Sequence, residues 1–408
     1  MWKTRKPAFE KAGWKNAIEA REWPANDPDM SLDDARYSVI RYFASSVENA
    51  QGPRVSDPRS GEIIESHIYW YHNVMNIFKH LYAIQVGHLD KRAQKPQFEE
   101  ELVGKLIRYV AAHEVGHTIG VLHNFGSSIA TPVEKLRDKE YIRKYGHTSS
   151  IMEYARFNYV AQEGDGIDPD HFIPRINDYD EWVIEWGYKL IFDKANEYEE
   201  SRVLDSWVKK NENNPRLWYG VEQHPYDPRM NNEDLGDNQM KANEYGIKNL
   251  KKIMPLQVEW TKEEGKNYDL LNERYFWITV QLNWYFSHVV KYIGGIHETY
   301  KKSEQDGVIY EVTPKAKQKE AMDFLRRHLF ETPKWLLQKD IISRIRPNFG
   351  TDAIRGLQEN FLNAMLNTGT LQRLIECNTL DAANYSADEM VDDLRKIIWS
   401  EVDARKTN

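Results

Sequence analysis

The sequence predicts an α+β fold, in which a mixed, twisted sheet and one long helix are followed by an all-helical region. Two observations lead to this prediction. The N-terminal part contains segments that alternate apolar and polar residues as strands do, and a long helical pattern at residues 98–119. From Tyr179 onward, nearly every patterned segment has helical spacing. We therefore expect two domains, residues 1–175 and 176–408, with the change of character near residues 170–180.

The composition is that of a globular protein. The 408 residues, 41% hydrophobic and 12% aromatic, are enough for two or three domains with buried cores. The net charge of −8, without a dominant basic patch, gives no reason to expect nucleic acid as a partner. The single cysteine, Cys377, excludes an intrachain disulfide, and no apolar run approaches the ~20 residues that span a bilayer. Residues 1–10 lack the apolar stretch of a signal peptide, so none is expected in this chain.

Short strands and turns are expected in the N-terminal region. Pro7–Ala12 has the pattern of a helix end, because a glycine follows it. The segments with strand-like composition or alternation are Ala17–Ala20, Arg36–Ala44 and Glu62–Tyr69. Turn signals at Gly52-Pro53 and Asp57–Gly61 lie before the last of these strands.

Helical spacing begins at Tyr71 and dominates the rest of the chain. Phe98–Ile119 aligns apolar residues along one side, and a loop rich in glycine and serine follows it to about Ser150. Later helices are expected at Asp180–Ala195, Tyr268–Tyr292, Pro314–Leu329 and Ala387–Val402. Tyr275–Phe286 is apolar on nearly all sides, which predicts the core of the helical domain; a ligand groove lined by its aromatic residues is the alternative.

Three histidines and a glutamate have the spacing of a catalytic zinc site. His113 and His117 are four residues apart, so on a helix both imidazoles can reach one cation. Gly120 can adopt a positive φ, which turns the chain and brings in His123 as the third ligand. Three nitrogen ligands leave the fourth tetrahedral position for water, and Glu114 stands where a general base takes a proton from that water. The alternative is a set of coincidental core histidines, which would be costly to bury without a ligand.

A second segment, Ser149–Tyr154, follows about thirty residues after the histidines. It resembles the Met-turn of metzincin peptidases, in which a methionine forms a hydrophobic floor beneath the zinc-bound histidines. Met152 matches that methionine. Tyr154 matches the tyrosine of astacin- and serralysin-type metzincins, which binds zinc at rest and then hydrogen-bonds the oxyanion. An ordinary core methionine and a structural tyrosine are the alternatives, and Asn124 replaces the glutamate that astacins carry after the third histidine.

The segment Ala112–Gln162 resembles a family of large, exported bacterial zinc metalloproteases. Shorter similar stretches extend the resemblance over most of the chain: Ala8–Gly13, Asp57–Glu62 and Glu233–Gly236. The resemblance implies a metzincin-type catalytic domain and a location that is extracellular or periplasmic. Metzincin domains normally begin with a strand and a full helix before the segment that matches Pro7–Ala20. We therefore expect the first sheet strand to be missing from an N-terminally shortened catalytic domain.

These features together predict a zinc-dependent endopeptidase with one catalytic Zn²⁺, Glu114 as general base, and protein or peptide substrates. The alternatives are a catalytically inactive zinc-containing binding or surface protein and a zinc hydrolase of non-peptide amides. By analogy with the substrate strand of metzincins, five consecutive residues are expected to pair with an extended peptide: Gly61, Glu62, Ile63, Ile64 and Glu65. An ordinary sheet strand is the alternative reading of this segment.

The remaining histidines and acidic loops are not expected to bind metal. Four upstream histidines lack ligand spacing: His67, His72, His80 and His88. His147 is expected to have a core or surface role, although its closeness to the Met-turn leaves a contribution to the site as an alternative. Asp165–Asp170 and Glu233–Asp237 offer the oxygen ligands that Ca²⁺ prefers, but neither follows an EF-hand pattern, so solvated loops are expected.

Overall fold

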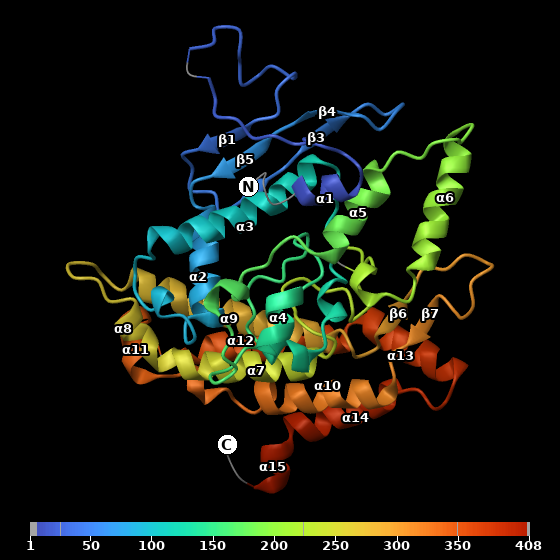
Figure 1. Cartoon of the computed structure of the whole chain (residues 1–408). Helices are drawn as coiled ribbons and strands as arrows, with labels where there is room; N and C mark the ends of the chain where they lie inside the picture. The colour runs from blue at the N-terminus through green and yellow to red at the C-terminus, as the bar shows by residue number, and fades with distance from the viewer. Residues whose placement is uncertain (1–5, 25, 223, 349, 406–408) are drawn as a thin grey trace. The chain divides into compact units, whose positions relative to one another are not determined.

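The computed structural model describes residues 6–24, 26–222, 224–348 and 350–405 (Figure 1). Residues 1–5, half of the N-terminal stretch that lacks a signal-peptide pattern, lie outside this range. The chain forms two compact units. Unit 1 contains residues 1–93, 97–221 and 235–237, and unit 2 contains residues 94–96, 222–234 and 238–408.

The division between the units does not coincide with the predicted boundary at residues 175 and 176. Helix α5 (Asp178–Tyr188) begins close to that point, but it packs against α1 (Lys6–Lys11) and belongs to unit 1. The Phe9 and Tyr188 rings lie 5.1 Å apart between these helices. The predicted change to helical structure near residue 178 therefore takes place inside unit 1.

The segment Leu235–Asp237 returns to unit 1 from a stretch that otherwise belongs to unit 2. The backbone N–H of Leu235 donates to the Tyr159 hydroxyl at 3.0 Å. The Asp237 carboxylate accepts the backbone N–H of Val133, also at 3.0 Å. Leu235–Asp237 thus belong to unit 1, whereas the residues directly before and after them in the chain belong to unit 2.

The strands of unit 1 form two small sheets instead of one. β5 (Ile68–Tyr71) pairs in parallel with β1 (Ile40–Phe43) and antiparallel with β2 (Ala50–Gln51). Separately, β3 (Arg54–Ser56) pairs antiparallel with β4 (Ile63–Ser66).

Proline at position 53 accounts for this division. The strand predicted at Glu62–Tyr69 is in fact two strands that meet at His67. There the Pro53 carbonyl accepts hydrogen bonds from the His67 backbone N–H and the Ser66 hydroxyl, but Pro53 has no N–H to continue the ladder. The strand predicted at Ala17–Ala20 is wrong, because this stretch is a loop with largely exposed side chains and no strand assignment.

Two helices form the core of unit 1 behind the sheets. The expected helices near residues 71 and 98–119 are present as α2 (Val74–Val86) and α3 (Glu100–Thr118), which pack against each other. α3 also contacts β2 and β5. The side chains that fill this region are at most 4% exposed: Leu81, Ile84, Leu102, Leu106 and Val110. Each such residue contributes roughly 1.5–3 kcal/mol by burial, so α3 is held firmly in place.

Short helical turns interrupt the loop that was expected between His123 and Ser150, and one of them is α4 (Lys139–Tyr145). The helix predicted at Asp180–Ala195 ends at Tyr188, and most of the residues that follow are exposed. A further helix of unit 1, α6, spans Glu197–Lys210.

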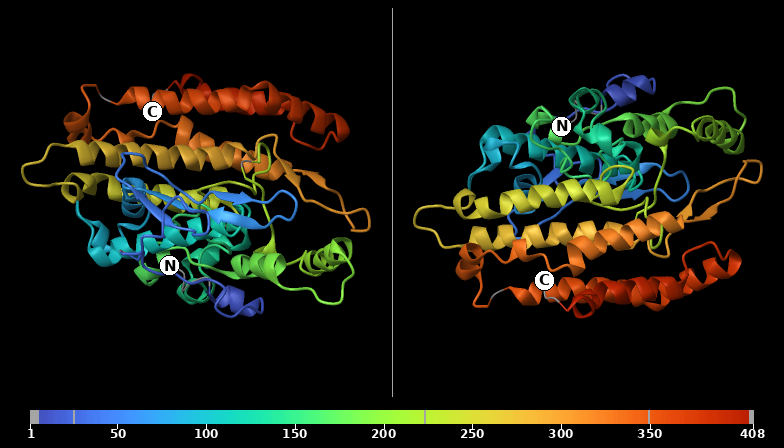
Figure 2. Two further views of the ribbon diagram at one scale, coloured as in Figure 1. Left: turned by 90° about the horizontal axis from the view of Figure 1, so that it is seen from above. Right: turned by 90° about the horizontal axis from the view of Figure 1, so that it is seen from below.

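The regular structure in the described residues of unit 2 is helical apart from one hairpin, β6 (Ile296–Glu298) with β7 (Tyr310–Val312). Its helices are α7 (Gln239–Ile253), α8 (Gln257–Trp260), α9 (Asp269–Val290), α10 (Lys315–Leu325), α11 (Lys339–Ile345), α12 (Thr351–Leu366), α13 (Thr368–Leu380), α14 (Ala387–Ile398) and α15 (Ser400–Ala404). Both views of Figure 2 show α7 (yellow) beside α9 (gold). α9 contacts α7, α10, α11 and α12 and carries the predicted core segment Tyr275–Phe286. No helix in the described ranges has the length and apolar character needed to cross a membrane.

Candidate metal centre

Three imidazoles from α3 and the turn that follows it converge at one point. His113 and His117 lie one helical turn apart, and Gly120, with φ of +88°, turns the chain so that His123 comes back beside them. The three Nε2 atoms are 3.1–3.2 Å from one another. Two ligands bound at ~2.0–2.1 Å to a tetrahedral ion lie about 3.3 Å apart, so this donor set fits one zinc ion.

Backbone carbonyls orient the first two histidines. His113 Nδ1 lies 2.7 Å from the Ile151 carbonyl oxygen, and His117 Nδ1 lies 3.0 Å from that of Val121. A carbonyl only accepts, so each Nδ1 carries a proton and each Nε2 keeps its lone pair for the metal. Burial, followed by the charges of His117 and His123, places the pKa of His113 well below its usual value, which keeps it in the neutral, ligating form.

Glu114 is buried beside these histidines, with 6% of its surface exposed. Burial raises the pKa of its carboxyl group to about 7, an effect that the nearby Arg156 charge opposes. A metal cation beside the carboxylate would, like Arg156, lower the pKa of Glu114. Glu114 lines a cavity of about 210 Å³ together with His113, Tyr154 and Arg156.

The predicted Met-turn is a buried turn that one aspartate anchors. Met152 is fully buried, and its carbonyl accepts the backbone N–H of Asn124 at 3.2 Å. Asp180, also fully buried, accepts the backbone N–H of Ile151 at 2.9 Å and the hydroxyl of Ser150 at 3.0 Å. The sequence interpretation missed Asp180. Its signal was the capping box at the start of α5, in which Asp180 accepts the backbone N–H of Asn177.

Tyr154 lies against the histidine cluster. Its ring centroid is 5.4 Å from that of His113 and 4.7 Å from that of His123. The Phe125 ring also stacks on His123, at 5.2 Å with an interplanar angle of 17°, and lies 5.6 Å from the Tyr154 ring. Phe125 was not singled out from the sequence, although its position two residues after the third histidine is a place where a supporting ring is needed.

Arg156 is a second residue that sequence reasoning missed. Its guanidinium lies 4.3 Å from the Tyr154 ring centroid and 5.1 Å from that of Phe78. Its backbone has φ of +48°, a conformation that long side chains rarely adopt. Nothing in the sequence signals this conformation, because arginine has no preference for it.

The predicted substrate strand lies beside the end of the zinc-binding segment. Gly61 and Glu62 form the turn between β3 and β4, and the other three residues lie in β4: Ile63, Ile64 and Glu65. The Ile63 side chain lies 3.7 Å from where a Cβ would stand on Gly120. β4 pairs with β3 along one edge, and no described strand pairs with its other edge.

A glycine brings the chain between the two sheets onto α3. A Cβ on Gly52 would lie 2.6 Å from the Glu114 carbonyl oxygen and 3.0 Å from the Cβ of His117. Only glycine permits this approach, so Gly52 sets the distance between α3 and the backbone that precedes β3.

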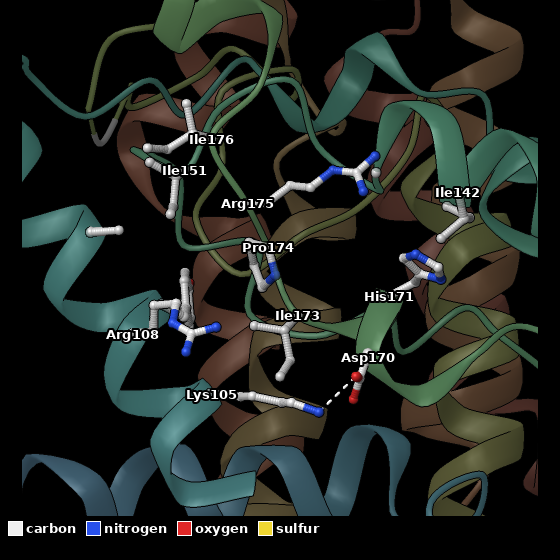
Figure 3. A pocket seen from close by; sticks show the side chains of 13 residues that line it. Lys105, Arg108, Ile142, Ile151, Asp170, His171, Ile173, Pro174, Arg175 and Ile176 are labelled. Carbon is white, nitrogen blue, oxygen red and sulfur yellow. Dashed lines mark hydrogen bonds and ion pairs between the residues drawn. The ribbon is translucent and has the colours of Figure 1, made fainter. Parts of the chain in front are cut away.

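A separate cavity of about 230 Å³ lies along α3 and is lined by Lys105, Arg108 and Arg175 (Figure 3). Lys105 donates to Asp170 at 2.6 Å, and Arg137 binds Asp165 at 2.7 Å. The acidic loop at residues 165–170 is thus matched by basic side chains and gives no support for Ca²⁺.

Among the described residues, the group of three or more possible ligands that can reach one ion consists of His113, His117 and His123. His147 is buried outside it, and burial lowers the pKa of its imidazole to about 4.

Comparison with known proteins agrees with this geometry. A family model described as Met-zincin matches residues 95–406, a range that includes the three histidines and the Met-turn. No curated protein and no solved structure matches the chain.

Proposed function

Because the chain belongs to the Met-zincin family, and is thus a zinc-dependent metalloprotease of the metzincin type, we propose that it is an endopeptidase with Glu114 as its general base. The main support is the convergence of three Nε2 atoms within 3.1–3.2 Å of one another. A buried carboxylate and a tyrosine ring adjoin the same point.

Each residue of the site has a separate role in the proposed mechanism. Zinc held by the three histidines would lower the pKa of a water molecule towards ~7 and polarise the scissile carbonyl. Glu114 takes the proton from the attacking water and delivers it to the leaving amine. Burial beside the three histidines holds the Glu114 carboxylate where it can accept that proton. The Tyr154 hydroxyl donates a hydrogen bond to the oxyanion as it forms.

The free edge of β4 is the proposed binding place for the substrate backbone. An extended peptide that pairs with Ile63–Ser66 gains main-chain hydrogen bonds while its own side chains remain available for recognition. The position of Ile63 beside Gly120 would bring such a peptide close to the third histidine. Export to the periplasm or the cell surface belongs to the same proposal and is based on the resemblance to exported metalloproteases.

Substitution of the base tests the mechanism. Glu114→Gln should retain about one zinc ion per chain and reduce cleavage of a peptide library by roughly 10²–10⁴-fold, the usual contribution of a general base. Glu100→Gln, at the exposed start of the same helix, should leave both zinc content and cleavage unchanged. A chelator should abolish cleavage and added zinc should restore it.

Three outcomes separate this proposal from its alternatives. Full activity of Glu114→Gln would refute the assigned base. Zinc-loaded wild-type protein that cleaves neither casein nor any library peptide would be a binding or surface protein instead. Turnover of small amides without proteolysis would identify a non-peptide amidase.

A further inference from the structure

We propose that Arg156 forms a subsite that binds a carboxylate of the substrate close to the scissile bond. The carboxylate is either an acidic side chain or the C-terminal carboxylate of a peptide. This inference builds on the proposed peptidase function and names its substrate class.

The backbone holds Arg156 in a conformation that is costly for its residue type. A φ of +48° places it in the left-handed region, at a cost of roughly 1 kcal/mol for a long side chain. Its neighbours Ala155 and Phe157 are both fully buried, so packing on either side enforces the conformation. A strained backbone conformation of this kind persists only where the surrounding structure holds it in place, and such conformations are concentrated at functional sites.

Two aromatic rings hold the guanidinium group. It lies 4.3 Å from the Tyr154 centroid and 5.1 Å from the Phe78 centroid, distances typical of cation–π contact. A guanidinium carries its five N–H donors in the plane of the group, a geometry that matches the two oxygens of a carboxylate. The arrangement orients the donors before a ligand arrives.

The cavity that Arg156 lines also contains the proposed catalytic base. Glu114, His113 and Tyr154 lie in the wall of the same 210 Å³ space. Much of the remaining wall is apolar: Val74, Ile77, Phe78, Tyr109 and Val110. In such partly dehydrated surroundings an ion pair is stronger than at the surface.

The lining of this cavity contains one basic side chain and two acidic ones. Arg156 is the single lysine or arginine among the residues that line it. The acids are Glu114, which is assigned to catalysis, and Glu48, which is exposed. A carboxylate that enters can form the paired, planar hydrogen bonds that arginine makes with this group.

Binding to the Glu114→Gln protein tests the subsite without turnover. The probes are fluorescent alanine-based hexapeptides with Glu, Gln or Lys at each position in turn, each made with a free C-terminal acid and as the amide. Anisotropy titrations of the zinc-loaded protein should show at least one Glu peptide, or the acid form, binding about 10–100-fold more tightly than its neutral match, as for a hydrogen bond to a charged group. A preference for Glu identifies a side-chain subsite, and a preference for the acid identifies recognition of the C-terminus.

Variants at position 156 then assign the preference. Adding Arg156→Gln should remove the difference between charged and neutral probes, and Arg156→Lys should retain part of it. Arg156→Asn, which tolerates the left-handed backbone, replaces the glutamine variant if that protein fails to fold. Arg108→Gln, an exposed arginine of α3 outside this cavity, should leave the preference intact.

The subsite would be refuted if charged and neutral probes bound equally well. Equal weakening of both probes by Arg156→Gln would also refute it, since that result shows Arg156 only positions Tyr154. Cleavage by the zinc-loaded wild-type protein is measured in parallel. Charge-dependent binding without cleavage would refute the peptidase function and leave the subsite standing, whereas cleavage without charge preference would do the reverse.

Discussion

The backbone carbonyl of Ile151 accepts a hydrogen bond from Nδ1 of His113 at 2.7 Å. The N–H of Ile151 in turn donates to the buried carboxylate of Asp180 at 2.9 Å. The first of the three predicted metal ligands is therefore oriented by the predicted Met-turn, and that turn is fixed by a residue of α5. This chain of contacts makes the metal centre depend on a helix that contributes no ligand.

Replacing Asp180 with alanine should weaken both the fold and the metal site. The change removes an acceptor of three hydrogen bonds from a fully buried position. We expect the free energy of unfolding to fall by about 3 kcal/mol and zinc affinity to fall by roughly 10-fold or more. Denaturant titrations and zinc competition with a chelating dye measure these two quantities. Glu181→Gln, at a partly exposed neighbouring position, should change stability by less than about 0.5 kcal/mol. Unchanged zinc affinity in Asp180→Ala would show that the Met-turn holds His113 without this anchor.

Two glycines, Gly52 beside α3 and Gly104 within it, should respond to alanine in opposite directions. Gly52→Ala places a methyl group 2.6 Å from the Glu114 carbonyl oxygen, so α3 or the preceding chain must move, at a cost of about 1–3 kcal/mol. Gly104→Ala, within α3 and with no atom inside 4 Å of its new Cβ, should stabilise the protein by about 0.5–1 kcal/mol. Thermal unfolding of both variants provides the comparison. A Gly52→Ala protein as stable as the wild type would mean that this close approach is not a constraint.

Tyr154→Phe separates the hydroxyl group from the ring that packs on the histidines. The ring contacts with His113 and His123 should survive, and zinc content should not change. If the hydroxyl stabilises the oxyanion, kcat should fall by about 10²-fold while KM changes little. Tyr141→Phe, in the short helix α4, is the matched control and should retain wild-type kinetics. An unchanged kcat in Tyr154→Phe would leave the tyrosine with a structural role only.

Buried histidines should make both units sensitive to acid. Burial lowers the pKa of His147, in unit 1, to about 4 and that of His288, in unit 2, to about 3. An unfolded histidine titrates near 6.5, so the stability that each neutral ring contributes is complete above that pH and is lost as the pH falls towards the folded value. Each should account for about 2 kcal/mol of lost stability at pH 5.

Zinc-free protein is used for this measurement, because the metal ligands also release zinc in acid. Urea titrations at pH 7 and pH 5 give the loss for the wild type, and His147→Gln should reduce that loss by about 2 kcal/mol. The exposed His72→Gln should not alter it. An equal pH dependence in His147→Gln and the wild type would place this imidazole in a wetter environment than the structure shows.

The metal centre was predictable because its geometry is local. His113, His117 and His123 lie on one helix and the turn after it, and a residue spacing of four together with Gly120 determines their convergence. The long helices were predictable for a similar reason, since apolar periodicity determines which face is buried. The α+β character of the chain followed from these patterns.

What the sequence did not reveal depends on contacts between distant segments. The role of Asp180 arises only when α5 packs near the Met-turn. Asp180 and its partner Ile151 are 29 residues apart in the chain. The left-handed backbone of Arg156 lies between two neighbours that are fully buried against other segments, Ala155 and Phe157. The division of the sheet had a visible signal in Pro53, but that residue was interpreted as part of a turn instead of as the end of a ladder.

The return of Leu235–Asp237 to unit 1 has a consequence for dissecting the protein into fragments. A fragment that ends at Val221 would lack the partners that these three residues supply to Val133 and Tyr159. The C-terminal fragment, in turn, would carry Leu235–Asp237 without Val133 and Tyr159, the residues to which they hydrogen-bond. No single cut in the gene therefore separates the two units, and function should be assigned with the chain intact.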